Sequence, residues 1–158
     1  MLSRPSLLAL AAFLAVLGWQ ALTVRANYSG NWTGLFRTGA NAPVPSALLP
    51  STLRNAHPVG YDGQFYRILA HDPLLRHGAA AFLDAPALRA GRILIPALAY
   101  AIAAGQPAWI DAAYILLIDA SVAAGVFLLA LLFLHYGRPA PFGLLFLLLP
   151  PALSPSIR

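Results

Sequence analysis

Hydrophobic residues gather in long runs along this chain. The first run extends from Leu7 to Val24, and the clearest extends from Ala112 to Leu134. A helix needs about 20 apolar residues to cross a bilayer, so both runs have the length of a membrane span. A cleaved signal peptide is the alternative for the first run, because Val24-Arg25-Ala26 resembles a small-residue cleavage site. We favour an uncleaved anchor, because the run is long for a signal core.

Two shorter apolar stretches follow the polar middle of the chain. Ile93–Ala104 contains Pro96 and is short for a span, so it is expected to be re-entrant or interfacial. Phe142–Leu149 begins another apolar element, which Pro150-Pro151 bends or ends. This last element looks unfinished, and we therefore expect a piece of a larger protein. If Ile93–Ala104 does not span the membrane, Arg138 lies in the cytoplasm. If it does span, Arg138 lies outside. The positive-inside rule favours the cytoplasmic position.

The segment between these runs is polar. Residues 25–92 hold seven of the ten Arg and three of the five Asp. The sequence therefore predicts an all-α, polytopic transmembrane protein in three parts. These are an N-terminal span (1–24), a long extracytoplasmic loop with short helices (25–92) and further membrane helices (93–158).

Two short helices are predicted within the loop. The first starts after Asp62 and runs to about His71, where Asp72-Pro73 stops it, since the residue before proline avoids helical geometry. Its apolar face would hold Phe65, Ile68 and Leu69. The second starts after Asp84, with Pro86 in its first turn, and is expected to run on into Ile93–Ala104. Gly105-Gln106-Pro107 would break it before the long apolar run.

The composition excludes an ordinary soluble domain. Apolar residues make up 59% of the chain and charged residues 9%, against about 25% charged residues in typical globular proteins. The chain contains no Cys, and its net charge is +5. Next to such apolar runs, this positive charge favours anionic lipid or a phosphate-bearing substrate over nucleic acid. The all-Arg usage, with abundant Ala, Leu, Pro and Gly, suggests a GC-rich bacterial gene. Together with the apolar runs, this predicts a location in the bacterial inner or plasma membrane.

The segment Gly60–Arg67 carries the strongest candidate chemistry. Asp62 could act as a general base toward a hydroxyl or hold a divalent cation. Tyr61 and Tyr66 could stack on a sugar, and Arg67 could meet a phosphate. The structural alternative makes Asp62 a helix N-cap, the tyrosines an interfacial belt and Arg67 a solvated charge.

A second group of candidates follows. Asp72 offers a carboxylate beside an imidazole, or simply a helix-stop turn. Asp84 is a further acid or an N-cap. Arg89 and Arg92 lie one turn apart beside an apolar run, where they could bind a lipid phosphate or anchor the chain in the headgroups.

Two acids lie in the longest apolar run or at its start. Asp119 is costly inside a span and is a candidate ion site by default. A helix–helix contact is the favoured reading, because Ser121 and Gly125 form a small-residue step that permits close packing. Asp111 is expected to be a capping charge near the helix start.

The order of these features resembles a known family. Tyr61-Asp62-Gly63-Gln64-Phe65-Tyr66, Asp72-Pro73, Asp84-Ala-Pro86-Ala-Leu-Arg89 and Arg92-Ile-Leu-Ile-Pro96 follow a first span. The pattern is similar to the start of bacterial GT-C type glycosyltransferases, which are related to the mannosyltransferases of GPI-anchor assembly. The chain has fewer spans than such enzymes, so it matches their amino-terminal part only.

The resemblance implies transfer of a sugar from a polyprenyl-phosphate donor on the outer membrane face. Asp62 would match the first-loop catalytic acid of the family. Asp72 or Asp84 would support it, and Arg89 and Arg92 would suit the donor phosphate. A divalent cation is the conceivable cofactor, and the sequence names no protein partner.

Two other hypotheses stay open. The chain could be a non-catalytic membrane subunit whose loop binds a partner. It could also be a transporter fragment with Asp119 as its proton or ion site.

Overall fold

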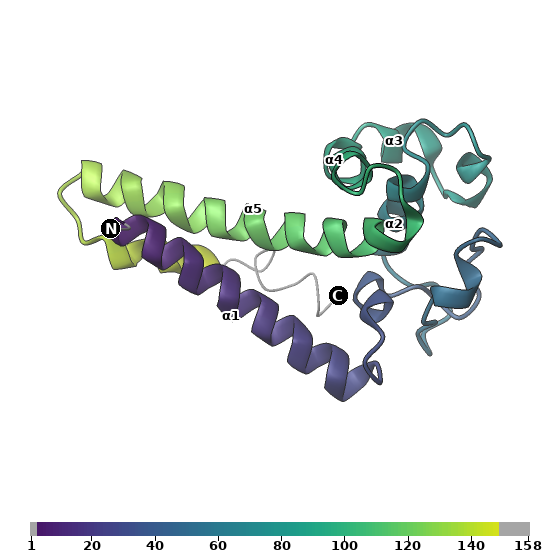
Figure 1. Cartoon of the computed structure of the whole chain (residues 1–158), viewed down its shortest axis with the longest axis horizontal. Helices are drawn as coiled ribbons and strands as arrows, with labels where there is room; N and C mark the ends of the chain where they lie inside the picture. Colours follow the sequence, from purple (N-terminus) through teal and green to yellow (C-terminus); the bar gives the residue numbers. More distant parts are fainter. Residues whose placement is uncertain (1–2, 149–158) are drawn as a thin grey trace. The chain divides into compact units, whose positions relative to one another are not determined.

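The computed structural model describes residues 3–148, and this part of the chain is mostly helical. The elements in chain order are α1 (Arg4–Asn27), η1 (Trp32–Phe36), η2 (Leu49–Ser51), α2 (Gly63–His71), η3 (Ala79–Phe82), α3 (Pro86–Ala90), α4 (Leu94–Ile102), α5 (Pro107–His135) and η4 (Ala140–Leu148) (Figure 1). The described residues contain no strand, and Thr38 makes only isolated bridges with Arg54 and Gly60. The predicted all-α class is confirmed.

The backbone contacts divide the described residues into two compact units. One, here called the helical unit, holds residues 3–23 and 118–148. The other, here called the loop unit, holds residues 24–117. Both α1 and α5 contribute residues to each unit.

The two long predicted helices are present and extend beyond the apolar runs that predicted them. By length and composition, α1 and α5 could each cross a membrane, with mean hydropathies of 2.1 and 2.5 over their most apolar windows. Only 22% and 28% of those windows are buried. The core helix of a soluble protein is instead mostly buried, so these helices present most of their apolar side chains outward.

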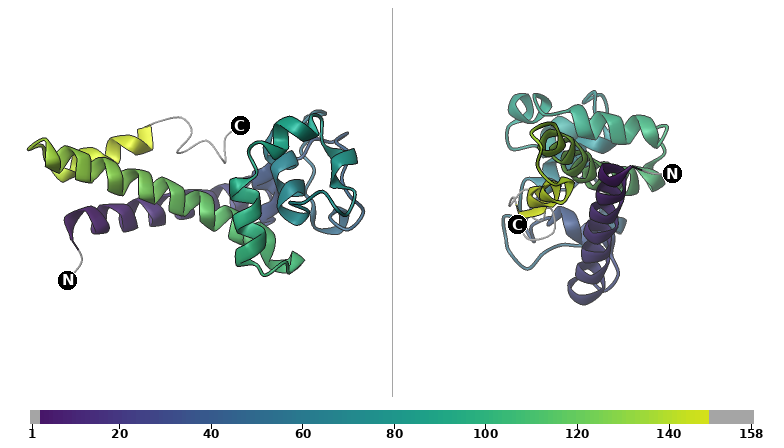
Figure 2. Two further views of the ribbon diagram at one scale, coloured as in Figure 1. Left: turned by 90° about the horizontal axis from the view of Figure 1, so that it is seen from above. Right: turned by 90° about the vertical axis from the view of Figure 1, so that its left-hand side faces the viewer.

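Small residues allow close packing in the helical unit. Its residues of α1 and α5 lie side by side in both views (Figures 1 and 2), and Val16 packs with Val122. A Cβ on Gly125 would lie 2.5 Å from the Phe146 ring, which belongs to η4. Gly125 of the predicted small-residue step therefore serves packing. The apolar run that starts at Phe142 forms 3₁₀ turns as far as 148, and Leu149 and the two prolines after it lie outside the described residues.

The core of the loop unit lies on one face of α2. Ile68 and Leu69 are buried there with Leu48 and Leu83, and Phe65 packs against them. These spacings match the predicted apolar face. The expected start after Asp62 and stop at Asp72-Pro73 are likewise confirmed.

The expectation of one helix from Asp84 through Ala104 is wrong. The first part, α3, ends at Ala90, and α4 begins at Leu94 after a turn at Gly91-Arg92. Pro96 explains the break, because in a continuous helix its ring would clash with the carbonyl of residue 92. As the third residue of α4, Pro96 occupies a position where the helix has no partner for an N–H in any case.

A tight corner joins α4 to α5. Ala104 and Gly105 adopt left-handed conformations with φ of 50° and 70°, and a Cβ on Gly105 would lie 2.8 Å from the Tyr100 hydroxyl. Ala99 packs near Ile110 on the other side of the corner. The predicted break at Gly105-Gln106-Pro107 is confirmed. In Figure 1, α4 is viewed down its axis, whereas α5 lies in the plane of the picture.

Candidate functional site

One arginine joins two aspartates of the loop unit. Arg89 donates from Nε and Nη2 to the two carboxylate oxygens of Asp84, each at 2.9 Å. It also donates from Nη2 to Asp62 Oδ1 at 2.9 Å, and its Nη1 lies 2.8 Å from Asp62 Oδ2. The guanidinium is thus shared between two carboxylates that are far apart in the sequence. We call Asp62, Asp84 and Arg89 the Arg89 cluster.

The local folds of α2 and α3 bring the Arg89 cluster together. Asp62 immediately precedes α2, and Asp84 lies just before α3, which carries Arg89. The guanidinium lies 4.7 Å from the Phe65 ring centroid and 5.4 Å from that of Tyr66. These aromatic contacts suit a planar cation.

Burial is unequal within the cluster. The side chain of Arg89 is 7% exposed, whereas those of Asp62 and Asp84 are 64% and 49% exposed. The cation is therefore inside and the two anions face solvent. The cluster carries one net negative charge on an accessible surface.

Arg89 sets the ionisation of both acids. Its hydrogen bonds lower the pKa of Asp62 and of Asp84 below 3.8, and the two acids raise the pKa of Arg89 in turn. Arg92 adds a smaller electrostatic contribution that also lowers the pKa of Asp62. Both carboxylates are ionised at neutral pH and can accept hydrogen bonds from hydroxyl groups. In this arrangement they are weak bases, since a general base works best with a pKa near the working pH.

The alternative reading of these acids as N-caps holds only for the position of Asp62. Asp62 occupies the N-cap position of α2, but its side chain makes no capping hydrogen bond. The N-cap of α3 is Ala85 rather than Asp84. Both carboxylates instead bind Arg89. Patterns at helix ends do not predict these ion pairs.

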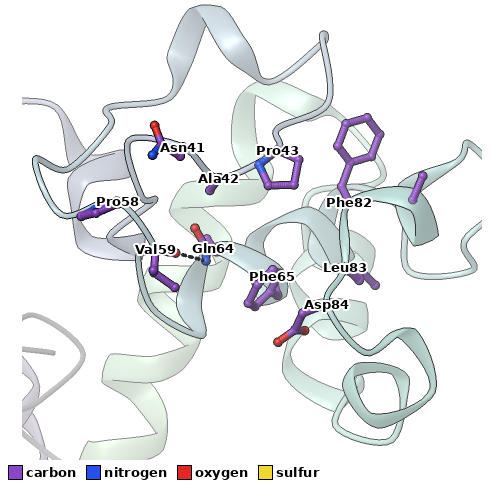
Figure 3. A pocket seen from close by; sticks show the side chains of 11 residues that line it. Asn41, Ala42, Pro43, Pro58, Val59, Gln64, Phe65, Phe82, Leu83 and Asp84 are labelled. Atoms are coloured by element: carbon purple, nitrogen blue, oxygen red, sulfur yellow. Dashed lines mark hydrogen bonds between the residues drawn. The ribbon is translucent and has the colours of Figure 1, made fainter.

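A pocket of about 370 Å³ opens beside the cluster (Figure 3). Asp84 lies on its wall with Phe65 and Leu83, and the amide side chains of Asn41 and Gln64 supply the other polar groups. The remaining lining residues are Ala42, Pro43, Pro58, Val59, Ala81 and Phe82. A mostly apolar pocket with a few polar groups is the usual form of a small-molecule site.

Gln64 fixes the loops that form this pocket. Its Oε1 accepts a hydrogen bond from the Gly39 amide at 3.1 Å, and its Nε2 donates to the Val59 carbonyl at 3.0 Å. The backbones of Gly39 and Gly60 approach so closely that a Cβ on Gly60 would lie 2.4 Å from the Gly39 nitrogen. Gly60 also has a φ of 74°, which side chains disfavour. These contacts explain two residues of the motif for which the sequence suggested no role.

Tyr61 lies beside the Arg89 cluster but contacts a different arginine. The Arg37 guanidinium carbon lies 4.6 Å from the Tyr61 ring centroid. Tyr61 is 40% exposed, so part of its ring stays accessible. Tyr61 thus contacts Arg37, whereas its neighbour Asp62 contacts Arg89. No pattern in the sequence had selected Arg37.

Asp72 does not join the cluster. Its carboxylate is buried and accepts hydrogen bonds from the amides of Arg76 at 2.9 Å, His77 at 2.8 Å and Ala79 at 3.3 Å. Burial opposes ionisation, but these amide hydrogen bonds prevail and lower the pKa of Asp72. The carboxylate therefore shapes the turn after α2, as the helix-stop alternative expected.

Arg67 is buried rather than solvated, which overturns the alternative prediction of an exposed charge. It donates from Nε and Nη2 to Asp111, from Nη1 to Thr52 and from Nη2 to Ser51. All three nitrogens of the guanidinium have protein acceptors. His71 Nε2 lies 3.1 Å from the same aspartate. Asp111 consequently binds α2 and does not act as the expected capping charge.

Of the other candidates, Arg92 is exposed beside the cluster, and Asp119 belongs to the helical unit. Asp119 is fully buried and accepts a 2.7 Å hydrogen bond from Gln20 Nε2. This pair supports the reading of Asp119 as a helix–helix contact. Among residues 3–148, no group of three or more His, Cys, Asp or Glu side chains is placed to bind a metal ion.

No protein-family model, curated protein or solved structure matches the chain.

Proposed function

We propose that the chain is part of a multi-pass protein of a bacterial inner membrane. In this proposal α1 and α5 cross the bilayer, and residues 25–92 form an extracytoplasmic loop. The support is the combination of length, hydropathy and low burial in both helices. Leu14, Leu22 and Leu128 are 56%, 64% and 64% exposed, which is costly in water and favourable in lipid.

We further propose that the loop unit takes part in a GT-C-like transfer of a sugar from a polyprenyl-phosphate donor. The observation that carries the proposal is the Arg89 cluster beside its pocket. Two ionised carboxylates face solvent there, next to aromatic side chains. Carboxylates that accept from hydroxyls, together with aromatic surfaces, are the groups that sugars require.

Asp62 is the acid assigned to the acceptor hydroxyl, with Asp84 as its supporting group. A donor phosphate that bound Arg89 would compete with Asp62 for the same N–H groups. Loss of those hydrogen bonds would raise the pKa of Asp62 and make it a better base. Arg92, which is exposed beside the cluster, would add positive charge for the phosphate.

The test is sugar transfer in native membranes from radiolabelled polyprenyl-phosphate sugars. Asp62→Asn should abolish turnover while the amount of protein inserted in the membrane stays unchanged. Arg76→Gln is the control, because Arg76 is an exposed residue outside the cluster. Unchanged turnover in Asp62→Asn would remove Asp62 from the reaction.

A non-catalytic, partner-binding subunit is the second candidate. The observation that favours it is the ion-paired state of Asp62, which lowers the pKa of this acid and weakens it as a base. This candidate predicts a stable partner after purification in detergent. It also predicts that function survives Asp62→Asn.

A further inference from the structure

A second pocket in the loop unit is lined by arginines and by no acid. It has a volume of about 280 Å³ and contains Arg37 and Arg54. The other lining residues are Asn27, Tyr28, Ser29, Gly34, Leu53, Asn55 and Ala56. No Asp or Glu belongs to this wall, so no acid of the wall compensates the two positive charges.

Arg37, which lines this pocket, has an unsatisfied hydrogen-bond donor. Its Nε is buried and has no hydrogen-bond partner among the described residues. The arginine ion pairs among those residues involve Arg67 and Arg89, not Arg37. Its guanidinium is held against Tyr61 by a cation–π contact. A buried donor without an acceptor is unfavourable, and an acceptor on a ligand would satisfy it.

Arg54 is held in position by the neighbouring loop. Its Nη1 donates to the carbonyls of Gly39, Ala40 and Ala42 at 3.3, 2.6 and 3.0 Å. These neutral acceptors fix the guanidinium without cancelling its charge. The pocket is therefore positive before any ligand enters.

We propose that this pocket binds a phosphate-type oxyanion. Arg37 would donate Nε–H to one oxygen, and Arg54 would supply the second charge. Asn55 and Tyr28, which carry neutral hydrogen-bonding groups, also line the pocket. Guanidinium groups match the geometry of phosphate oxygens, and a volume of about 280 Å³ leaves room for a substituent on the phosphate.

The phosphate can come from a lipid headgroup or from a soluble compound. The lipid source rests on the membrane assignment proposed above, because Asn27, the last residue of α1, lines the pocket. If α1 crosses the bilayer, the pocket lies near the membrane surface. The pocket also lies close to the Arg89 cluster. Arg37 contacts Tyr61, and Tyr61 directly precedes Asp62 of that cluster.

Phosphate binding can be measured on the whole chain in nanodiscs by NMR of the arginine Nε–H groups. One arm adds inorganic phosphate and pyrophosphate to nanodiscs of phosphatidylcholine. The other arm replaces part of that lipid with phosphatidic acid. We expect a saturable shift of the Arg37 Nε–H resonance in at least one arm, which identifies the source of the phosphate.

Two variants test whether the shift arises in this pocket. Asn55→Asp places a negative charge on the wall but keeps an oxygen that can accept from the His57 amide, as Asn55 does at 3.4 Å. Arg37→Lys keeps the positive charge and removes Nε. Asn55→Asp should weaken phosphate binding about tenfold, because the new carboxylate repels the anion. Arg37→Lys should also weaken it about tenfold, because one hydrogen bond between charged groups is lost. Since this variant lacks the Arg37 Nε–H, its binding is followed at the Arg54 Nε–H. Arg76→Gln is the control and should leave the affinity unchanged.

The proposal is overturned if neither source of phosphate gives a saturable shift. It is also overturned if Asn55→Asp retains the fold by its NMR spectrum and binds phosphate as tightly as the wild type. Sugar transfer is a separate readout. If Asp62→Asn abolishes transfer but Arg37 binds no phosphate, the transferase proposal stands and the phosphate pocket does not.

Discussion

Arg67 and Asp111 form an ion pair in which Nε and Nη2 of the arginine donate to the aspartate, with Nη2 at 2.8 Å from Oδ2. The pair joins α2 to the first turns of α5 within the loop unit. The arginine side chain is 3% exposed and that of the aspartate 20%. A charge held at such low exposure depends on its partner, because water cannot replace the lost contact.

Asp111→Asn should destabilise the protein strongly. Removing one partner of a buried ion pair typically costs about 3–5 kcal/mol, because the other charge remains buried. Chemical unfolding in detergent, followed by circular dichroism, would measure the change. The double variant Arg67→Met with Asp111→Leu should recover much of the loss. If Asp111→Asn unfolds at the wild-type denaturant concentration, the pair contributes nothing to stability.

The Gln20–Asp119 hydrogen bond leads to a second prediction. Both side chains are buried in the helical unit, and the bond measures 2.7 Å. Gln20→Leu should destabilise the protein by about 1–3 kcal/mol, because it leaves the aspartate buried without this donor. Gln20→Leu combined with Asp119→Leu should be less destabilised than Gln20→Leu alone. Thermal unfolding in detergent tests this order, and the reverse order would contradict it.

The Arg89 cluster predicts a loss of stability in acid. Asp62 and Asp84 have folded pKa values below 3.8 because Arg89 stabilises their ionised forms. Their contribution is therefore fully present above the unfolded pKa of about 4 and disappears as pH falls through the folded values. Carboxyl-carbon NMR should show the Asp62 pKa rising toward 3.8 in Arg89→Met. An Asp62 pKa that did not change would contradict the assigned cause.

That titration has an internal control. Asp72 also has a lowered pKa, but its cause is hydrogen bonding to backbone amides of the turn after α2. Arg89→Met should leave the pKa of Asp72 unchanged in the same spectra. A parallel shift of Asp72 would indicate general unfolding of the loop unit instead of loss of one guanidinium.

Periodicity made the helices of this chain predictable. The apolar run Ala112–Leu134 lies within α5, and the spacing of Phe65, Ile68 and Leu69 matched the buried face of α2. The effect of proline on helix continuity was predicted less well. The ring of Pro96 forbids a continuous helix through residue 92, and this local rule should have outweighed the apolar continuity of Ile93–Ala104.

The candidate site was predictable only in part. Asp62, Asp84 and Arg89 were each selected from the sequence, and the structure brings all three together. Their pairing was not foreseen, because local patterns at helix ends suggest caps and contain no information on contacts across the loop. Arg37 was missed for the same reason, since its contact with Tyr61 depends on the folded loop.

Apolar side chains on α4 form an exposed row. Leu94, Leu98 and Ile102 are 70%, 41% and 63% exposed at helical spacing, whereas Pro96 and Ala99 on the opposite side are buried. Such a row in water would be unfavourable, and rows of this kind mark surfaces that meet a partner or a membrane. This agrees with an interfacial position, one of the two options predicted for Ile93–Ala104.

The position of α4 in the chain favours the membrane. It ends just before α5, whose first turn carries Trp109 with 63% exposure. Exposed tryptophans are typical of the membrane interface. Because α4 runs across the first turns of α5 (Figure 1), it would lie along the bilayer surface if α5 crosses the bilayer. Arg92, which is exposed just before α4, would then reach the headgroups.

Spin labels on single cysteines can test this orientation of α4, since the natural chain contains no cysteine. In nanodiscs, labels at Leu94, Leu98 and Ile102 should be more accessible to oxygen than to a water-soluble nickel complex, because oxygen concentrates in lipid. Leu128 in α5 serves as the lipid control, and Val59, which is 70% exposed in the loop unit, as the water control. If Leu128 reports lipid while the three α4 labels report water, α5 is in the membrane and α4 is not. If Leu128 also reports water, the membrane assignment itself is wrong, so the two failures can be told apart.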